Sequence, residues 1–323
     1  MNNFKQISKK IKVLTIDNPR DPKKIKWYNI INPEKKEIKY LKENFDFEDK
    51  HLQASLSKHI SQRPIVHRGK NYIFIILHFP VLGPNKQIIP GEIEFFVGHG
   101  FLISLHDGKT KALNNFFNYC REDTIFLESY NLESSAILLY EILEKLIQDS
   151  YELLDKNNVE INELEEIIFS QKQKIITAQL LKLKRNIINI RRIIQNHKNI
   201  MKKLTEMKSS LVSQNKIFNY YDSLAIHSER IWEFSETQKE IIDSLQDTSD
   251  SISSYRINNI MKTLTVVSII LMPLNLIASM LGMNLNPNPL RTSEGLNDFF
   301  ITSAIMIIVG LILLLFFRKK RWL

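Results

Sequence analysis

The sequence predicts an α+β protein, with an N-terminal mixed α/β cytosolic domain, a long helical stalk and two C-terminal transmembrane helices. Three observations lead to this prediction. Short apolar segments of strand type occupy the first part of the 323 residues, and long stretches without glycine or proline follow them. Two apolar runs without a charge then lie close to the C-terminus.

Composition narrows the classes of partner. Lysine and arginine outnumber aspartate and glutamate by 44 to 35, and the net charge of +9 favours an anionic partner. Because neither zinc-finger spacing nor an aromatic-basic platform is present, we expect membrane lipid as the partner and no nucleic acid. The single cysteine, Cys120, cannot form an intrachain disulfide. The basic N-terminus has no apolar signal-peptide core behind it, so we expect the soluble part to stay in the cytosol.

Shifts in pattern along the chain set the expected domain limits. Glycine and proline mark the ends of regions, and uncharged runs mark the membrane. The expected regions are a cytosolic α/β domain at 1–125, a long helical hairpin and stalk at 126–260, a first transmembrane helix at 261–281, an extracytoplasmic loop at 282–298, a second transmembrane helix at 299–317 and a basic cytosolic tail at 318–323.

The N-terminal region alternates between strand and helix patterns. Pro33 to Asn44 and Glu48 to Ser57 have helical periodicity, with Asn32 as the expected N-cap of the first helix. Gly98-His99-Gly100 has the composition of a hairpin turn. The expected strands are Lys10 to Ile16, Lys26 to Ile31, Asn71 to Phe79, Glu92 to Val97 and Leu102 to Leu105.

A helical hairpin with segregated charge is expected from Leu132 to about Lys203, with its break near Phe169-Ser170-Gln171. Glu141 to Glu166 contains nine acidic residues and two lysines, whereas Gln171 to Thr205 contains ten basic residues and no acidic one. A charge run is most often a solvated face. The functional alternative is that the acidic arm concentrates divalent cations, while the basic arm lies near lipid or pairs with acidic arms.

The stalk is expected to be one long helix. From about Lys216 there is no glycine or proline until Pro273, so an unbroken helix would be roughly 85 Å long. Such a helix cannot be buried in a small domain, so we expect it to bundle with copies of itself. Small or polar residues interrupt its heptad-like apolar pattern and predict a wet interior: Ser228, Ser235, Gln238 and Ser249.

Two runs have the length and composition of membrane spans. Leu264 to Leu281 and Phe299 to Phe317 contain 18 and 19 residues without a charge. At about 1.5 Å per residue each approaches the thickness of a bilayer core. Basic residues precede the first run and follow the second, whereas Arg291 is the only basic residue of the loop between them. The positive-inside rule therefore places both termini in the cytosol and the loop outside.

A stripe of mixed polarity follows one side of the first span. Its members recur at helical steps of three or four residues, polar at both ends and apolar in the middle, as a narrow pore would require. The alternative is a helix–helix contact through small and polar residues. Two spans cannot enclose a pore, so the pore hypothesis requires a homo-oligomer. The stripe residues are Asn258, Met261, Leu264, Ser268, Met272, Asn275 and Ser279.

The outer end of this span carries Gly282-Met283-Asn284. An exposed backbone turn at a membrane boundary, with an amide side chain in it, can hold a cation that keeps its water shell. We find no sign of an enzyme. The eight histidines are scattered, Cys120 has no partner pattern, and GxSxG and P-loop motifs are absent.

Several of these segments together resemble the CorA magnesium-transporter family. A lone Gly-Met-Asn triplet is a weak signal, but its position at the end of the first of two C-terminal spans is specific. The resembling segments are Asn258 to Thr265, Met272-Pro273-Leu274, Gly282-Met283-Asn284 and Lys319 to Leu323, and upstream Gln62-Arg63-Pro64, Asn71 to Phe74 and Lys182 to Arg192.

The resemblance implies a homopentameric, channel-like transporter of the inner cell membrane, with a funnel of cytosolic domains and long helices. It implies that Mg²⁺, and with it Co²⁺ or Ni²⁺, is selected in hydrated form at a ring formed by Asn284 and the Gly282 carbonyl. The first span would line the pore, and the membrane potential would drive the ion. Mg²⁺ is also the implied regulatory ligand, which closes the pore at acidic positions that match Asp247 and fall at or beside Asp222.

Three departures from the family pattern bear on these expectations. The outer loop, Asn286 to Leu290, lacks the usual glutamate. The sensor position falls on Ser223 in an ungapped count, and the loop Leu82 to Lys86 lacks its acidic partner, which leaves Glu92 or Glu94 as substitutes. Leu281 and Leu285 replace the aromatic residues that flank the triplet. Two alternatives stay open: a zinc transporter of the same fold, and a pore-less membrane-anchored coiled-coil sensor.

Overall fold

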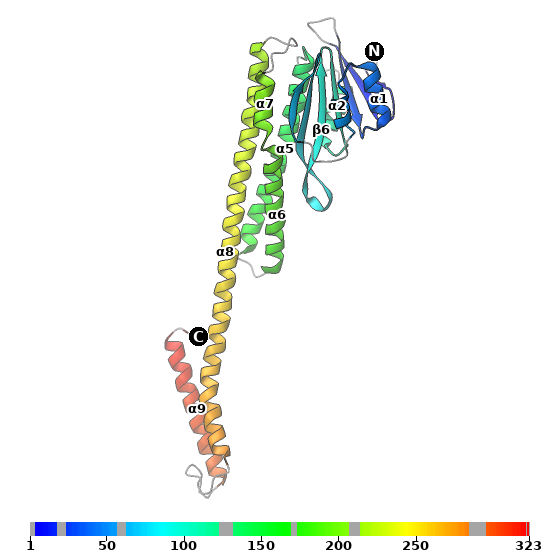
Figure 1. The fold of residues 1–323 in the computed structure, drawn as a ribbon. Coiled ribbons are helices and arrows are strands. Elements are labelled where there is room, and N and C mark those ends of the chain that lie inside the picture. Colours follow the sequence, from blue (N-terminus) through cyan, green and yellow to red (C-terminus); the bar gives the residue numbers. More distant parts are fainter. Residues whose placement is uncertain are drawn as a thin grey trace. The chain divides into compact units, whose positions relative to one another are not determined.

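The computed structural model describes residues 4–17, 24–56, 63–122, 132–168, 173–206, 214–283, 295–320 and 322 (Figure 1). The chain divides into two compact units, Met1–Gln246 and Asp247–Leu323. The division falls inside the region that we expected to be hairpin and stalk.

The first unit is built on a seven-stranded sheet with the order β1-β2-β3-β7-β6-β5-β4. All neighbouring strands are antiparallel except β3 and β7, which are parallel. The turn at His99-Gly100 joins β6 to β7, as predicted from its composition. The strands are β1 Phe4–Gln6, β2 Ile11–Ile16, β3 Ile25–Ile31, β4 Ile65–Arg68, β5 Tyr72–Leu82, β6 Ile88–Gly98 and β7 Phe101–His106.

Helices cover both faces of this sheet, and α8 continues into the second unit. The predicted α+β class is confirmed, and the charged hairpin is present because α5 packs against α6. The helices are α1 Lys35–Asn44, α2 Asp49–Ala54, the 3-10 turn η1 Pro84–Lys86, α3 Lys111–Glu122, α5 Ser135–Ile168, α6 Gln173–Ile194, α7 His197–Glu206, α8 Gln214–Gly282 and α9 Gly295–Lys319.

Each face of the sheet has its own hydrophobic core. Helices α1 and α2 pack on one face around residues such as Leu41 and Phe74. The larger core lies on the other face, where α3 and α5 to α7 surround Trp27 and the adjacent strands. Residues of α8, among them Leu224 and Ile231, belong to this same core. The N-terminal part of α8 therefore belongs to the first unit (Figure 1).

The start of α1 differs from our expectation, and the N-cap prediction at Asn32 is wrong. Asn32 has a φ of 50°, and its N–H donates to the carbonyl of His106 at 2.8 Å, so it still belongs to the β3–β7 edge. The helix begins at Lys35, and the N–H of Glu34 donates to Oε2 of Glu37 at 3.1 Å. Long-range strand pairing, which no local pattern reveals, delays the helix by two residues.

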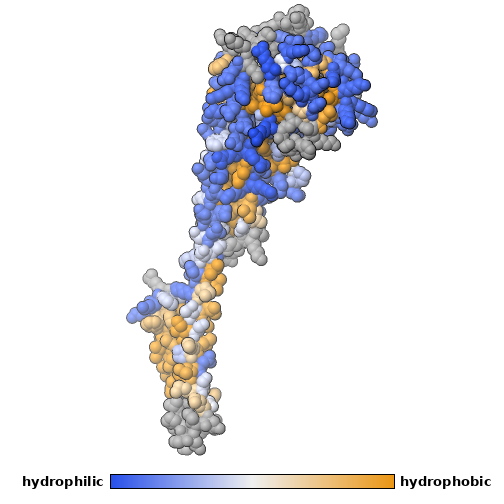
Figure 2. Space-filling view, in the orientation of Figure 1, coloured by the Kyte–Doolittle hydropathy of each residue, from blue (hydrophilic) through white to orange (hydrophobic). Residues whose placement is uncertain are grey.

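The second unit contains the end of α8 and all of α9. Helix α8 continues through Pro273 to Gly282. Within this unit Val266 is fully buried, and a Cβ on Gly310 would lie 3.8 Å from Cδ1 of Leu274, which places α8 and α9 in contact. Both helices contain windows apolar enough to cross a membrane, and only 6% and 0% of those windows are buried within the chain. A core helix of a soluble protein would be mostly buried, and Figure 2 shows apolar residues gathered on this surface.

Candidate functional site

The predicted stripe lies on the open surface of α8. Asn258, Met261, Leu264, Ser268, Met272, Asn275 and Ser279 are all exposed in the single chain. Met272, in the middle of the stripe, is 76% exposed. Among the described residues, these side chains therefore have no packing partner that would hide them.

The opposite side of α8 contacts α9. The more buried residues of the membrane segment gather on this side, namely Val266, Ile270, Pro273, Leu274 and Ile277. At about 100° per residue, the centre of this set lies about 180° around the helix from the stripe. The stripe is thus not the contact between the two helices of one chain. An exposed side of a membrane helix can contact lipid, another copy or water, and the polar members of the stripe favour another copy or water.

The hydroxyl groups of this segment are satisfied in part by their own helix. The Ser268 hydroxyl donates to the carbonyl of Leu264 at 2.9 Å, and Thr265 donates to Met261 at 2.7 Å. Donation to the backbone leaves the oxygen lone pairs of Ser268 available on the exposed side. Such oxygens are ligands or second-sphere acceptors of the type that hydrated hard cations prefer.

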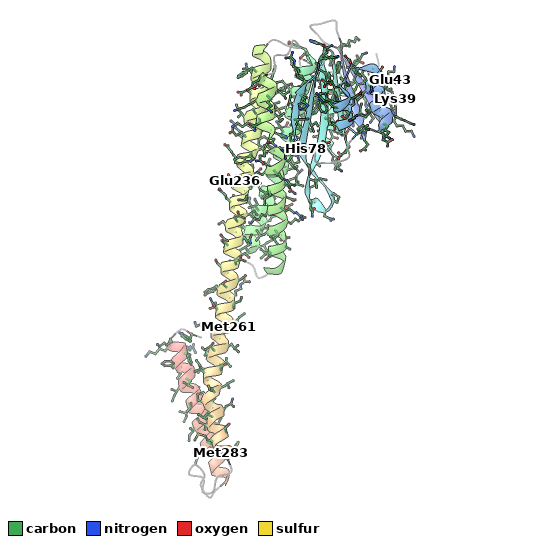
Figure 3. All side chains as sticks on the ribbon, in the orientation of Figure 1. Lys39, Glu43, His78, Glu236, Met261 and Met283 are labelled. Carbon is green, nitrogen blue, oxygen red and sulfur yellow. The ribbon has the colours of Figure 1, made fainter. Side chains whose placement is uncertain are left out.

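Helix α8 ends at the Gly-Met-Asn triplet. Gly282 is its last residue, Met283 follows with 51% exposure, and Asn284 lies outside the described residues (Figure 3). A Cβ added to Gly282 would meet nothing within 4 Å. Packing among the described residues therefore gives no reason for glycine there. The outer loop and its substitutions at 285–290 also lie outside the described residues.

The two expected regulatory carboxylates lie on α8, seven turns apart. Asp222 is half-buried in the first unit, and Asp247 is the exposed first residue of the second. The Ser223 hydroxyl donates to the carbonyl of Tyr220 at 2.8 Å. No set of three or more His, Cys, Asp or Glu side chains in the described residues is arranged to hold a metal ion. A regulatory site at these positions would need further groups from another copy or from outside the described residues.

The tip of the β5–β6 hairpin, which contains no carboxylate, is hydrogen-bonded to α6. Asn186 accepts the N–H of Ile88 at 3.0 Å and donates to the carbonyl of Lys86 at 3.0 Å. Two residues away on the same helix, Lys184 pairs with Asp243. The hairpin tip therefore lies near the level of Asp243 and far along α8 from Asp222.

The substitutes suggested for the missing sensor carboxylate do not suit the role. Oε2 of Glu92 lies 2.8 Å from Nε2 of His78, so this carboxylate already has a partner. Glu94 is buried, and burial raises its pKa to about 8, with the nearby Glu92 charge adding to the shift. A carboxyl group that stays protonated at neutral pH is a poor ligand for Mg²⁺.

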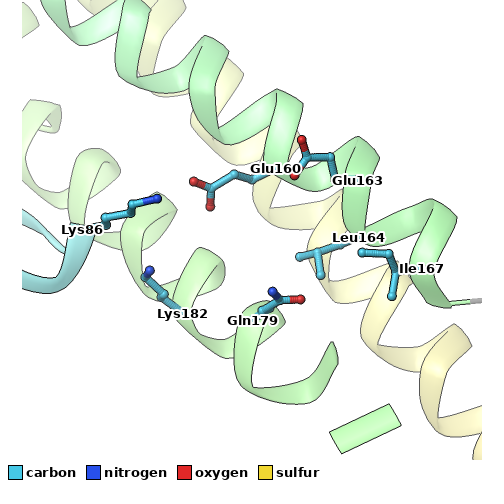
Figure 4. A pocket seen from close by; sticks show the side chains of 7 residues that line it. All are labelled: Lys86, Glu160, Glu163, Leu164, Ile167, Gln179 and Lys182. Carbon is cyan, nitrogen blue, oxygen red and sulfur yellow. The ribbon is translucent and has the colours of Figure 1, made fainter. Parts of the chain in front are cut away.

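The first unit contains a charged cavity that we did not predict from the sequence. It has a volume of about 240 Å³ and lies between α5, α6 and the tip of the β5–β6 hairpin. Glu160 points toward Lys86 and Lys182 (Figure 4), but within the described residues these groups form no ion pair inside 4 Å. The sequence feature that could have indicated this cavity is the segregation of acidic residues on α5 and basic residues on α6, which pack against each other. The lining residues are Lys86, Glu160, Glu163, Leu164, Ile167, Gln179 and Lys182.

Comparison with known proteins accounts for almost the whole chain. The family model described as CorA-like Mg²⁺ transporter protein matches residues 22–319. The cobalt/magnesium transport protein CorA of Thermotoga maritima is 27% identical over 308 residues, which cover 94% of this chain and 85% of the relative.

Solved structures share the fold. The complete structure of the CorA magnesium transporter from Methanocaldococcus jannaschii aligns with a TM-score of 0.79 at 20% identity, covering 93% of this chain and 92% of that one. The ZntB cytoplasmic domain from Vibrio parahaemolyticus aligns with a TM-score of 0.61 at 18% identity, covering 75% of this chain and 98% of that one. At these identities the likeness concerns the fold and carries no information on ion preference.

Proposed function

This chain belongs to the CorA-like Mg²⁺ transporter family, and from that premise we propose that it is a homopentameric channel for Mg²⁺. The channel admits Co²⁺ or Ni²⁺ as alternative ions. Residues 1–246 face the cytosol, the two apolar helices cross the inner membrane, and both termini are cytosolic. Relatives described as magnesium or cobalt/magnesium transport proteins support this choice of ions.

The exposed stripe on α8 carries the proposal. A pore-less anchor would bury its polar membrane residues against its own second helix, because unpaired polar groups are costly in lipid. Here α9 packs on the opposite side of α8. Copies of α8 arranged around an axis would give Ser268, Asn275 and Ser279 water, and would make Leu264 and Met272 the narrow apolar positions.

Selection takes place at the outer turn. Mg²⁺ gives up its water reluctantly, so a ring of amide and carbonyl oxygens at Gly282, Met283 and Asn284 would bind the ion with its shell intact. Among the described residues Gly282 has open space around it, which suits a position where copies approach one another. The loop lacks the glutamate usual in the family, so Asn284 carries more of the selection.

Passage is passive. A divalent cation entering a cell gains about 4.6 kcal/mol per 100 mV of membrane potential, which is twice the value for one charge. Cytosolic Mg²⁺ closes the pore by binding between copies, with Asp247 and Asp222 as the regulatory carboxylates. We expect weaker closure than in relatives with a complete sensor, since the hairpin loop 82–86 offers no carboxylate.

Ion flux into liposomes tests the proposal. The purified protein should carry Mg²⁺ and Co²⁺, and Asn284→Ala should lower Mg²⁺ flux at least tenfold. Asn288→Ala, a second asparagine of the same loop, serves as the matched control and should retain the flux. Zinc flux without magnesium flux would favour the zinc alternative. No flux of any of these ions from well-folded protein would leave the pore-less sensor.

A further inference from the structure

Three ion pairs join α6 and α7 to α8 at a repeat of seven residues on both sides. Nζ of Lys184 lies 2.6 Å from Oδ1 of Asp243, and Nη1 of Arg191 lies 2.6 Å from Oε2 of Glu236. The third pair joins Lys198, at the start of α7, to Glu229. We call these three pairs the ladder. Because α6–α7 and α8 run antiparallel, each step of seven residues back along one matches a step of seven forward along the other.

The repeat keeps the pairs on one side of each helix. Seven residues are about two turns, so charges at this spacing face the same neighbour. The acidic repeat on α8 extends to Asp222 and Asp250. The corresponding positions on α6–α7 are Thr205 and Thr177, which are not basic. The matched charges are thus limited to the part of α8 that belongs to the first unit.

Neighbouring groups add contacts to two of the pairs, Arg191–Glu236 and Lys184–Asp243. The guanidinium of Arg191 lies 4.8 Å from the ring centre of Trp232, one turn before Glu236 on α8. Nζ of Lys239 lies 3.8 Å from Oε1 of Glu236 and 3.5 Å from Oδ2 of Asp243 (Glu236 is labelled in Figure 3). Lys184, through its hydrogen bond, holds the pKa of Asp243 below its usual value. A network of this kind exceeds a single surface pair in strength.

The buried side of α8, which contains Leu224, Ile231 and Ile242, specifies the register of the helix only weakly. Ser228 and Ser235 are buried on this side, and their hydroxyls donate to their own helix, to Leu224 at 2.8 Å and to Ile231 at 2.7 Å. Because these hydroxyls donate to their own helix, they make no hydrogen bond as donors to a neighbouring helix. Gln238, fully buried, donates to the carbonyl of Leu154 at 2.8 Å. The register of α8 is therefore specified by polar contacts between helices and not by the two serines, as buried polar residues specify register in coiled coils.

The ladder is distinct from a cation site. Each of its carboxylates already has an ammonium or guanidinium partner from the same chain. Its last pair, at Asp243, lies just before Asp247, where the second unit begins. The helix that leaves the first unit at this point is the one that carries the exposed stripe.

We propose that Lys184, Arg191 and Lys198 are positioning residues for transport. Through Asp243, Glu236 and Glu229 they hold α8 in one register on α6–α7, so that a movement of the cytosolic bundle is passed to the pore helix instead of being lost by slippage. This proposal rests on the proposed channel function.

Charge exchange at the middle pair tests it, in full-length protein reconstituted into liposomes. The variants are Glu236→Arg, Arg191→Glu and the double exchange, with Glu236→Gln as a milder change that preserves folding. Glu233→Arg is the matched control, because Glu233 is exposed one turn away and has no ion pair among the described residues. The readouts are the melting temperature and the internal Mg²⁺ concentration that halves the flux.

We expect each single change to shift the half-closing Mg²⁺ concentration about tenfold, or about 1.4 kcal/mol, and to lower the melting temperature. The double exchange should restore both within about twofold, and the control should match the parent. Restored melting without restored Mg²⁺ dependence would overturn the positioning role, as would parental behaviour of both single variants. A parent without flux would refute the channel function and the transport role of the ladder together. The melting temperatures alone would then show whether the pair fixes the register.

Discussion

The two units of this chain differ in where their side chains find partners. In the first unit, buried polar groups such as Trp27, His106 and Gln238 bond to strands and helices of the same chain. In the second unit, large apolar residues and the polar stripe of α8 are exposed together. The first unit finds these partners within its own chain, whereas the exposed side chains of the second fit the proposed oligomer in a membrane. This difference indicates where the chain acts on an ion.

The largest expected effect is the loss of the first unit's central aromatic residue. Trp27 is fully buried, packs edge-on against Phe117 with ring centres 4.9 Å apart, and donates to the Ser104 hydroxyl at 3.0 Å. Trp27→Ala should lower the free energy of unfolding by about 3–5 kcal/mol. Thermal melting of the purified protein measures the loss. A decrease below about 1 kcal/mol would mean that this core is not the unit's main source of stability.

The buried Glu94 predicts how the stability of the first unit depends on pH. Its pKa is about 8 in the folded protein because of burial and 4.5 when unfolded, so the folded state binds the proton more tightly. Stability should therefore be undiminished below about pH 4.5, fall as the pH rises, and level off above about 8, with a loss on the order of a few kcal/mol.

Glu94→Gln should remove this fall and make the protein more stable at pH 8. Glu43→Gln, at an exposed site on α1, is the control and should keep the parental pH profile. Melting temperatures measured from pH 5 to 9 compare the three proteins. The same decline in the parent and in Glu94→Gln would assign the pH dependence to other groups.

A substitution on the exposed stripe of the second unit should change ion flux without changing the stability of the protein. Asn275 is exposed on the stripe, so Asn275→Leu removes no contact within the chain. We expect the melting temperature to stay within about 2 °C, while Mg²⁺ flux into liposomes falls about tenfold because a polar group of the conduction path is lost. Leu276→Ile, at the neighbouring exposed position, is the control. Equal flux from both variants would remove Asn275 from the path.

The smallest effect is expected at a surface ion pair of the first unit. Nζ of Lys39 lies 3.7 Å from Oε1 of Glu43, one turn away on α1, and both side chains are mostly exposed (Figure 3). Lys39→Ala should change the free energy of unfolding by less than about 0.5 kcal/mol. Chemical denaturation measures this value. A larger loss would show that even the surface of this unit is tightly coupled.

Local patterns predicted the elements whose signals are local. The strands within β2, β3, β5, β6 and β7, the α5–α6 hairpin and the long α8 follow from alternation, apolar runs and the absence of breakers. Helix α3 was missed, although Leu113, Phe116, Phe117 and Cys120 have the spacing of a buried helical face. The start of α1 was misplaced because Asn32 bonds to His106, 74 positions away. Strand pairing at that range has no local signature.

The sequence indicated one helical face as the candidate site, and both its role in an ion path and the homopentamer remain predictions. The stripe could be read from steps of three and four, and its position opposite α9 needed the structure. The basic arm was expected to meet lipid or acidic arms, yet Lys184 and Arg191 pair with α8. The matching repeats of seven were visible in the sequence, but their pairing depends on the fold. Asn284 remains a prediction, since it lies outside the described residues.

Cysteine accessibility tests the central claim, that the exposed stripe of α8 lines the ion path. The chain suits this test because burial raises the pKa of its one thiol, Cys120, to about 12, which keeps it unreactive. Ser268→Cys on the stripe and Ile270→Cys on the less exposed side of α8 would each be made in a Cys120→Ser background. Mg²⁺ flux is then measured before and after a charged, water-soluble thiol reagent. We predict that the reagent blocks flux through Ser268→Cys and leaves Ile270→Cys unchanged; equal responses, or no response at Ser268→Cys despite confirmed labelling, would contradict the account.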